Sequence, residues 1–151
     1  EYKEGVDYMC NSNDNKCISE ILKVINILQQ NAECSDSCLE TCDRGFLGCN
    51  TNTCLCNTRP VTLYTCGSDS PWRMPTTRDN VDCDAVGATC SSVFRVEKVD
   101  GNCATFRVLA ANPDTATSAT MPYVSTNSFF TMNLGCVCCL KCLADTYVET
   151  I

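Results

Sequence analysis

Sulfur dominates the chemistry available to this chain, because sixteen of its 151 residues are cysteine and none is histidine. A cysteine fraction this high is typical of chains that are cross-linked by disulfides or loaded with metal. The absence of histidine removes the usual general base, the usual activator of a thiol and the commonest nitrogen ligand of zinc. The cysteines therefore indicate cross-linking rather than catalysis.

Every cysteine of the chain is a candidate for a disulfide within or between subunits. They are Cys10, Cys17, Cys34, Cys38, Cys42, Cys49, Cys54, Cys56, Cys66, Cys83, Cys90, Cys103, Cys136, Cys138, Cys139 and Cys142. A chain of this length buries enough surface to fold without so many bridges, so we expect some of them to join neighbouring subunits. Cys10, on a polar N-terminal arm, and Cys17 are the first candidates. The sequence does not define which cysteines pair.

Some cysteine spacings also suit other chemistry. Two sets have the spacing of four-thiolate zinc sites, namely Cys136, Cys138, Cys139 and Cys142, and Cys34, Cys38, Cys54 and Cys56. Metal sites seldom recruit cysteines that are spread evenly along a β-rich chain, so metal binding is an alternative rather than the leading interpretation. The C-x-x-C motif Cys139–Cys142 lacks the βαβ context of a redox fold. We therefore expect no enzyme activity, no cofactor and no metal site.

The net charge of −7 limits the partners. Nucleic acid and anionic membranes both require a basic face, so we expect neither as a partner. No stretch approaches the roughly 20 apolar residues of a membrane span. The first residues, Glu1–Gly5, also lack the apolar core of a secretion signal. Either a signal has been removed or the protein leaves the cytosol by another route.

The chain divides into an arm at residues 1–16, rich in Asn and Asp, and a single cysteine-rich β domain with a leading helix at residues 17–151. The helix is predicted over 17–30, where the apolar residues Ile18, Ile21, Leu22, Ile25 and Leu28 follow helical spacing. A helix with one such stripe packs it against the core.

A β-hairpin is the clearest strand feature, and its turn contains Asp100-Gly101. A two-residue Asp-Gly loop would place Phe94 opposite Arg107. A three-residue loop at 99–101 pairs Phe94 with Phe106 and puts Gly101 at the left-handed position of a bulged turn. The outer face of the hairpin then carries Arg95, Glu97, Cys103, Thr105 and Arg107. We prefer the three-residue loop, because burial of one face fixes strand register more strongly than a dipeptide preference.

The other strands are predicted at 61–65 and near the C-terminus. In the last strand, Phe130, Met132, Leu134, Cys136 and Cys138 are expected on one face, and Phe129, Thr131, Asn133 and Val137 on the other. Residues 67–91 and 112–127 are predicted as irregular surface connections. The fold class is therefore mainly β, an antiparallel β-sandwich or barrel-like domain with an N-terminal amphipathic helix, rich in disulfides.

Three segments resemble the cysteine-rich spore coat Y/Z proteins and the related exosporium protein Y of spore-forming Bacillota. They are Val93–Thr105 (VFRVEKVDGNCAT), Met132–Leu143 (MNLGCVCCLKCL), and Asn57–Pro60 leading into Leu63–Thr65. The helix from Cys17, followed by the Cys34/Cys38 cluster, occupies the place of a similar element in the family. Cys139 stands where the family pattern usually has alanine.

This resemblance implies a structural subunit of the outermost spore layer (exosporium, crust or coat) that carries no catalytic site. It implies self-assembly into an ordered array or fibre that inter-subunit disulfides lock. The partners are then copies of the same chain and other spore coat or exosporium proteins. The resemblance also implies synthesis in the mother-cell cytoplasm without a signal peptide, and a final location at the spore surface. The alternatives are a thiolate metal-binding protein and a secreted disulfide-rich binding module that uses the 67–91 or 112–127 loops.

Overall fold

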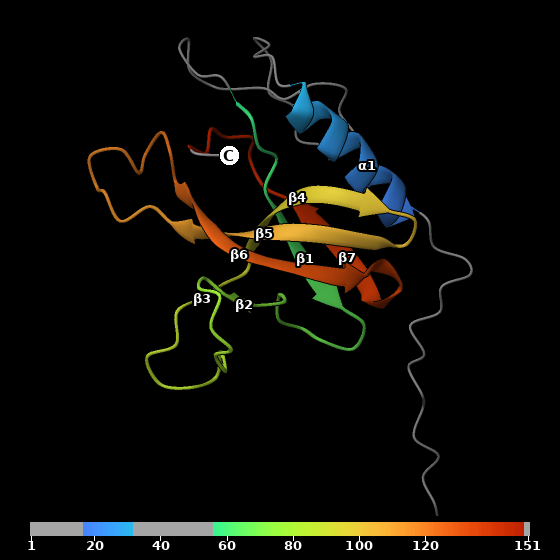
Figure 1. The fold of residues 1–151 in the computed structure, drawn as a ribbon, viewed down its shortest axis with the longest axis horizontal. Helices are drawn as coiled ribbons and strands as arrows, with labels where there is room; N and C mark the ends of the chain where they lie inside the picture. The colour runs from blue at the N-terminus through green and yellow to red at the C-terminus, as the bar shows by residue number, and fades with distance from the viewer. Residues whose placement is uncertain (1–16, 32–55, 150–151) are drawn as a thin grey trace, which may run out of the picture.

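The computed structural model describes residues 17–31 and 56–149, which form one α-helix, one short 3-10 helix and an antiparallel β-structure (Figure 1). The elements are α1 (Cys17–Gln30), β1 (Val61–Thr65), β2 (Met74–Pro75), β3 (Cys90–Ser91), β4 (Val93–Asp100), β5 (Cys103–Ala111), β6 (Tyr123–Asn133), the 3-10 helix η1 (Leu134–Cys136) and β7 (Val137–Cys142). The predicted mainly β, antiparallel architecture with a leading helix is confirmed.

The main sheet has five strands in the order β6-β5-β4-β1-β7. β1 joins β4 through the single residue pair Val61↔Phe94, whereas β1 and β7 pair along their whole length. The sheet therefore consists of a three-stranded part and a β1–β7 ribbon, which Figure 1 shows crossing behind β4 to β6. Within the described residues the strands form this one open sheet and the small β2–β3 pair, and a closed barrel or a sandwich of two large sheets is not confirmed.

Helix α1 has the predicted bounds, and its apolar stripe packs onto the sheet as expected. Leu22 and Ile25 are completely buried and belong to the same core cluster as Val61, Phe94 and Phe106. The core therefore lies where the helix, the three-stranded part and the β1–β7 ribbon meet.

The hairpin register differs from the prediction. β4 and β5 pair Phe94 with Val108 and Asp100 with Cys103, so the loop is Gly101-Asn102 and the three-residue loop at 99–101 was wrong. A two-residue loop with glycine at its first position suits a tight hairpin turn, and Gly101 does adopt a positive φ of 58°.

A β-bulge at Glu97 allows this turn to coexist with a correctly buried face. The bulge shifts the register between Val96 and Lys98. As a result Phe94, Val96 and Phe106 are all fully buried, as the pattern predicted, although Phe94 and Phe106 are not paired directly. Sequence periodicity identified the inward face, but it could not show where an extra residue would be accommodated.

The predicted last strand is two strands. β6 ends at Asn133, whose side chain accepts a hydrogen bond from the Gly135 amide at 2.9 Å, and η1 turns the chain into β7. The break changes the alternation of faces, so Val137 is buried in the same core cluster as Met132 and Leu134, and the prediction that it lies on the opposite face from them was wrong. At its other end β6 begins at Tyr123, which shortens the predicted 112–127 loop.

The connection at residues 67–91 is largely irregular, as predicted, but it contains the short antiparallel pair of β2 and β3. No helix among the described residues is both long and apolar enough to cross a membrane.

Candidate cross-linking surface

Two disulfides with both partners defined join described segments. Cys66–Cys138 links the end of β1 to β7 across 72 residues of sequence, with the two Cα atoms 5.1 Å apart. Cys83–Cys90 closes a loop across seven residues, with the Cα atoms 5.8 Å apart. Both Cα separations lie in the range that a disulfide requires. The first bond ties together distant parts of the chain, and the second constrains one connection.

The disulfides bear on both candidate zinc sets. Cys56, Cys136 and Cys142 are disulfide-bonded, as Cys138 is. A sulfur in a disulfide is not a thiolate ligand. Three members of the set at 136–142 are therefore committed to disulfides, and no group of potential metal ligands occurs within residues 17–31 and 56–149.

Three cysteines of the described segments are free and exposed, namely Cys17, Cys103 and Cys139. Cys17 is the first residue of α1, Cys103 is the first residue of β5, and Cys139 lies in β7. Cys17 was a predicted inter-subunit candidate, whereas Cys103 and Cys139 were only members of the general cysteine set. The position of Cys103 on the outer face of the hairpin and the departure of Cys139 from the family pattern were the available signals.

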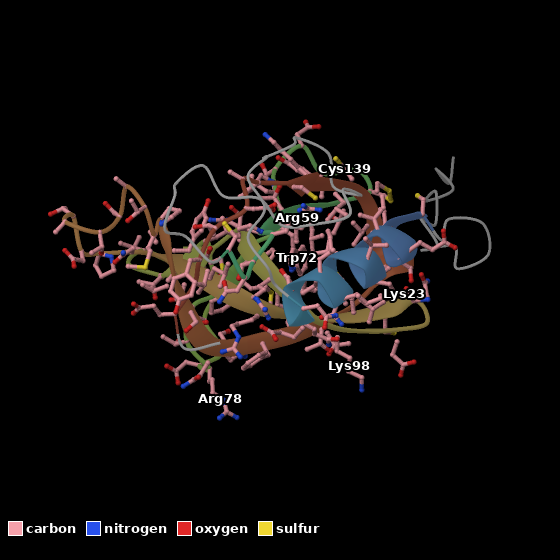
Figure 2. All side chains as sticks on the ribbon, turned by 90° about the horizontal axis from the view of Figure 1, so that it is seen from above. Lys23, Arg59, Trp72, Arg78, Lys98 and Cys139 are labelled. Atoms are coloured by element: carbon pink, nitrogen blue, oxygen red, sulfur yellow. A yellow bond between two sulfur atoms is a disulfide. The ribbon has the colours of Figure 1, made fainter. Side chains whose placement is uncertain are left out.

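Hydrogen bonds hold the start of α1, the β4–β5 turn that precedes Cys103 and the η1 turn that leads into β7 at one end of the fold. The Ser19 hydroxyl donates to the Gly101 carbonyl at 2.7 Å, which joins the start of α1 to the β4–β5 turn. The Leu134 amide donates to the Asn102 carbonyl at 2.8 Å, which joins η1 to the same turn. Figure 1 shows the start of α1, this turn and the β6–β7 connection at the same end of the molecule. Figure 2 shows Cys139 beside β7, on the opposite side of the fold from Lys98.

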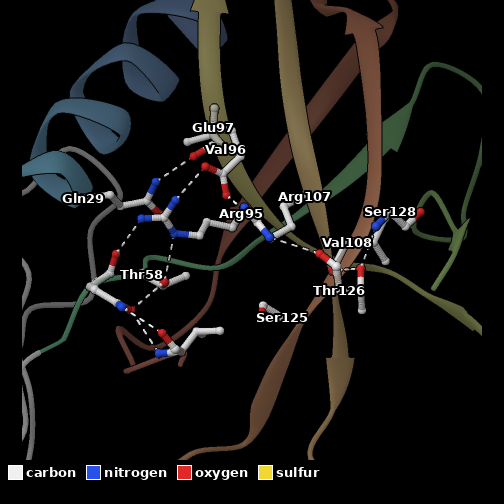
Figure 3. Close-up of polar contacts among 12 residues, drawn as sticks. Gln29, Thr58, Arg95, Val96, Glu97, Arg107, Val108, Ser125, Thr126 and Ser128 are labelled. Carbon is white, nitrogen blue, oxygen red and sulfur yellow. Dashed lines mark hydrogen bonds and ion pairs between the residues drawn. The ribbon is translucent and has the colours of Figure 1, made fainter. Parts of the chain in front are cut away.

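The far end of α1 is also fixed by a buried polar contact, shown in Figure 3. Gln29 is 5% exposed, and its side-chain amide donates to the Val96 carbonyl at 2.8 Å while its oxygen accepts from the Arg59 amide at 3.1 Å. The helix is thus hydrogen-bonded to the sheet near both ends and packed against it between them. This docking fixes the position of Cys17, and the apolar stripe alone did not predict it.

Three charged side chains of the hairpin form a partly buried network in Figure 3. Glu97, at the bulge, forms ion pairs of 2.9 Å with both Arg95 and Arg107. Burial lowers the pKa of Arg95, and the carboxylate of Glu97 opposes that effect. The prediction placed these residues on the outer face. Arg95 is nevertheless buried, because Thr58 and the Asn57 carbonyl cover it and accept its hydrogen bonds at 3.1 and 3.2 Å.

A second buried ion pair connects Arg59, two residues before β1, to the segment after β7. Arg59 binds Asp145 through two hydrogen bonds of 2.8 and 3.0 Å, and the two side chains are 2% and 7% exposed. Such bidentate pairs have well-defined geometry. Together with Cys66–Cys138, this pair fixes both ends of the β1–β7 ribbon.

The remaining predicted disulfide residues are Cys10, Cys34, Cys38, Cys42, Cys49 and Cys54, and they lie outside the described residues.

The connections at 67–91 and 112–127, which would bind a partner if the chain were a secreted binding module, both border surface hollows. A hollow of about 890 Å³ is lined by residues that include Arg78, Asp79 and Phe129. One of about 410 Å³ lies beside Asn112 and Tyr123.

Comparison with known proteins gives one family. The family model described as spore coat protein Z matches residues 6–123, which is most of the chain. No curated protein and no solved structure gives a significant match.

Proposed function

The chain belongs to the spore coat protein Z family, and on this premise we propose that it is a self-assembling structural subunit of the outermost spore layer. Family membership supports a structural protein of the spore surface, associated with other coat proteins, rather than an enzyme. The proposal adds that copies of the chain form an ordered array or fibre in the exosporium, crust or coat, and that disulfides between copies lock it.

The observation that carries this proposal is the set of exposed thiols at Cys17, Cys103 and Cys139. Other cysteines of the same chain are in disulfides, so oxidised sulfur is compatible with the folded state. An exposed thiol on a well-packed element has a defined position and, among the described residues of its own subunit, no disulfide partner. A neighbouring copy can supply that partner.

Each cross-link forms when two thiols lose two protons and two electrons to an oxidant such as molecular oxygen. In a growing array the neighbouring thiol is held nearby by non-covalent contacts, so its effective concentration is high and the bond forms between registered copies. Disassembly then requires reduction of covalent bonds, which suits a permanent shell.

The test compares boiled samples on non-reducing and reducing gels, together with electron microscopy of the same preparation. We expect a ladder that collapses to one band with reductant, and regular arrays or fibres on the grid. The variant Cys17→Ser/Cys103→Ser/Cys139→Ser should give a shorter ladder, and adding Cys10→Ser should shorten it further.

The matched control is Cys83→Ser/Cys90→Ser, which removes an internal disulfide and retains the three exposed thiols. It should retain the wild-type ladder. A single monomer band without reductant, or an unchanged ladder in the triple variant, would contradict the assignment of the cross-links to these thiols.

A further inference from the structure

The free thiol of Cys139 lies beside an exposed disulfide, and their arrangement follows from an irregularity in the β1–β7 pairing. Tyr64 pairs with Cys139 and Thr65 pairs with Val137, so Cys138 is the extra residue of a β-bulge. In such a bulge, two successive residues oppose one residue of the partner strand. Cys138 and Cys139 are accordingly both exposed, while Val137 is buried.

We propose that Cys66, Cys138 and Cys139 form a thiol–disulfide exchange site, in which Cys139 can replace Cys138 as the partner of Cys66. The Cα atoms of Cys66 and Cys138 are 5.1 Å apart. Consecutive Cα atoms are about 3.8 Å apart, so the Cα of Cys139 lies within about 9 Å of that of Cys66. A shift of a few ångströms brings this pair into the range that a disulfide requires.

Cys66 is placed where such a shift is possible. It follows the last residue of β1, is exposed, and begins a turn with Gly67, whose φ is +83°. The space around Gly67 is open, because a Cβ atom built there would meet nothing within 4 Å. The turn therefore has room to shift at Gly67, and the shift would break the hydrogen bond that the Cys66 amide donates to the Cys136 carbonyl at 3.4 Å.

The reaction conserves the number of disulfides. The thiolate sulfur of Cys139 attacks the sulfur of Cys66, the Cys66–Cys139 bond forms, and the Cys66–Cys138 bond breaks. The electron pair of that bond leaves with Cys138 as a thiolate, so no oxidant or reductant is consumed. Attack on Cys138 itself is disfavoured, because the Cα atoms of adjacent residues are closer than a normal disulfide allows.

The exchange goes beyond the proposed function, since it takes place within one subunit. Its consequence for assembly does rest on that function: the thiol offered to a neighbouring copy is Cys138 in one isomer and Cys139 in the other. The free thiol on the outer face of β7 therefore occupies one of two adjacent positions, depending on the isomer. A misplaced cross-link can rearrange by the same chemistry.

The test follows the free thiol in dilute monomer, where assembly does not contribute. The protein is incubated at mildly alkaline pH, because the thiolate is the attacking species. It is then labelled with N-ethylmaleimide at mildly acidic pH, digested without reduction and sequenced by tandem mass spectrometry. We expect loss of label from Cys139 and an equal gain at Cys138. Label that stays entirely on Cys139 would overturn the proposal.

Two variants test the geometry of the exchange whichever of the two disulfides, Cys66–Cys138 or Cys66–Cys139, is favoured in the wild-type protein. Cys138→Ser, oxidised by dissolved oxygen, which takes up the two protons and two electrons of the thiols, should form the Cys66–Cys139 disulfide, so that neither cysteine takes label. Label on both Cys66 and Cys139 in this variant would contradict the exchange geometry. Cys103→Ser is the matched control, since it removes an exposed thiol that is not part of this site and should leave the distribution of label unchanged. Absence of exchange in the labelling test does not remove the ladder on non-reducing gels. Absence of assembly does not change the distribution of label in dilute monomer. The two proposals therefore fail separately.

Discussion

The β1–β7 ribbon and the connection at residues 67–91 each carry a disulfide and an ion pair, but the two regions differ in what these interactions hold. In the ribbon, Cys66–Cys138 closes a loop across 72 residues, whereas Cys83–Cys90 in the connection closes one across seven. The chain-entropy model relates the stabilisation by a disulfide to the length of the loop that it closes. The ribbon disulfide therefore supports the whole fold, and the other supports a local segment.

The ion pairs show the same contrast. Arg59 and Asp145 at the ribbon are 2% and 7% exposed, whereas Arg73 and Asp84 in the connection are 47% and 85% exposed. A buried pair cannot lose one partner without leaving a desolvated charge, while an exposed pair is replaced by water. The comparison indicates that the interactions of the ribbon are integral to the fold, whereas the disulfide and the ion pair of the connection hold an exposed local segment.

The largest expected effect is at the buried ion pair. Arg59→Met leaves the Asp145 carboxylate without its guanidinium, and we expect a loss of about 3–5 kcal/mol in the free energy of unfolding. Denaturant unfolding followed by circular dichroism measures this loss. A loss below about 1 kcal/mol, the range of exposed pairs, would show that the ribbon is not held as the geometry indicates.

The ribbon disulfide gives the next largest effect. Cys66→Ser opens the long loop, and we expect a loss of about 4 kcal/mol in the free energy of unfolding without reductant. Cys138→Ser should lose clearly less if Cys139 takes over the bond to Cys66, because the new loop is almost the same length. Equal losses in the two variants would mean that this replacement does not occur.

Much of the fold could be predicted from periodicity. The bounds of α1 and the inward face of the hairpin both follow from apolar spacing, because burial selects one face of a helix or strand. Cys17 could also be identified as a candidate, and it is exposed and free.

The rest depends on interactions between distant segments. The bulges at Glu97 and Cys138 each add one residue to one strand, and an alternating pattern contains no signal for such an insertion. Burial of Arg95 and Gln29 depends on the residues that cover them from other elements. The pairing of Cys66 with Cys138 likewise required the strand order, since sequence spacing allows many connectivities.

In the connection, the local disulfide should have a smaller effect than the one in the ribbon. Cys83→Ser/Cys90→Ser opens a loop of only seven residues, so we expect a loss of about 2–3 kcal/mol at most. The same unfolding measurement applies. A loss as large as that of Cys66→Ser would remove the distinction between the two regions.

The smallest effect is expected at the exposed ion pair of the connection. Arg73→Met removes a contact of 2.6 Å to Asp84, but both side chains keep access to water. Water solvates the remaining carboxylate, so we expect a loss of about 0–1 kcal/mol, reduced further by salt. Arg59→Met is the matched comparison, because it makes the same substitution in a buried pair whose loss should change little with salt. A large, salt-independent loss at Arg73 would show that the connection is packed as firmly as the ribbon.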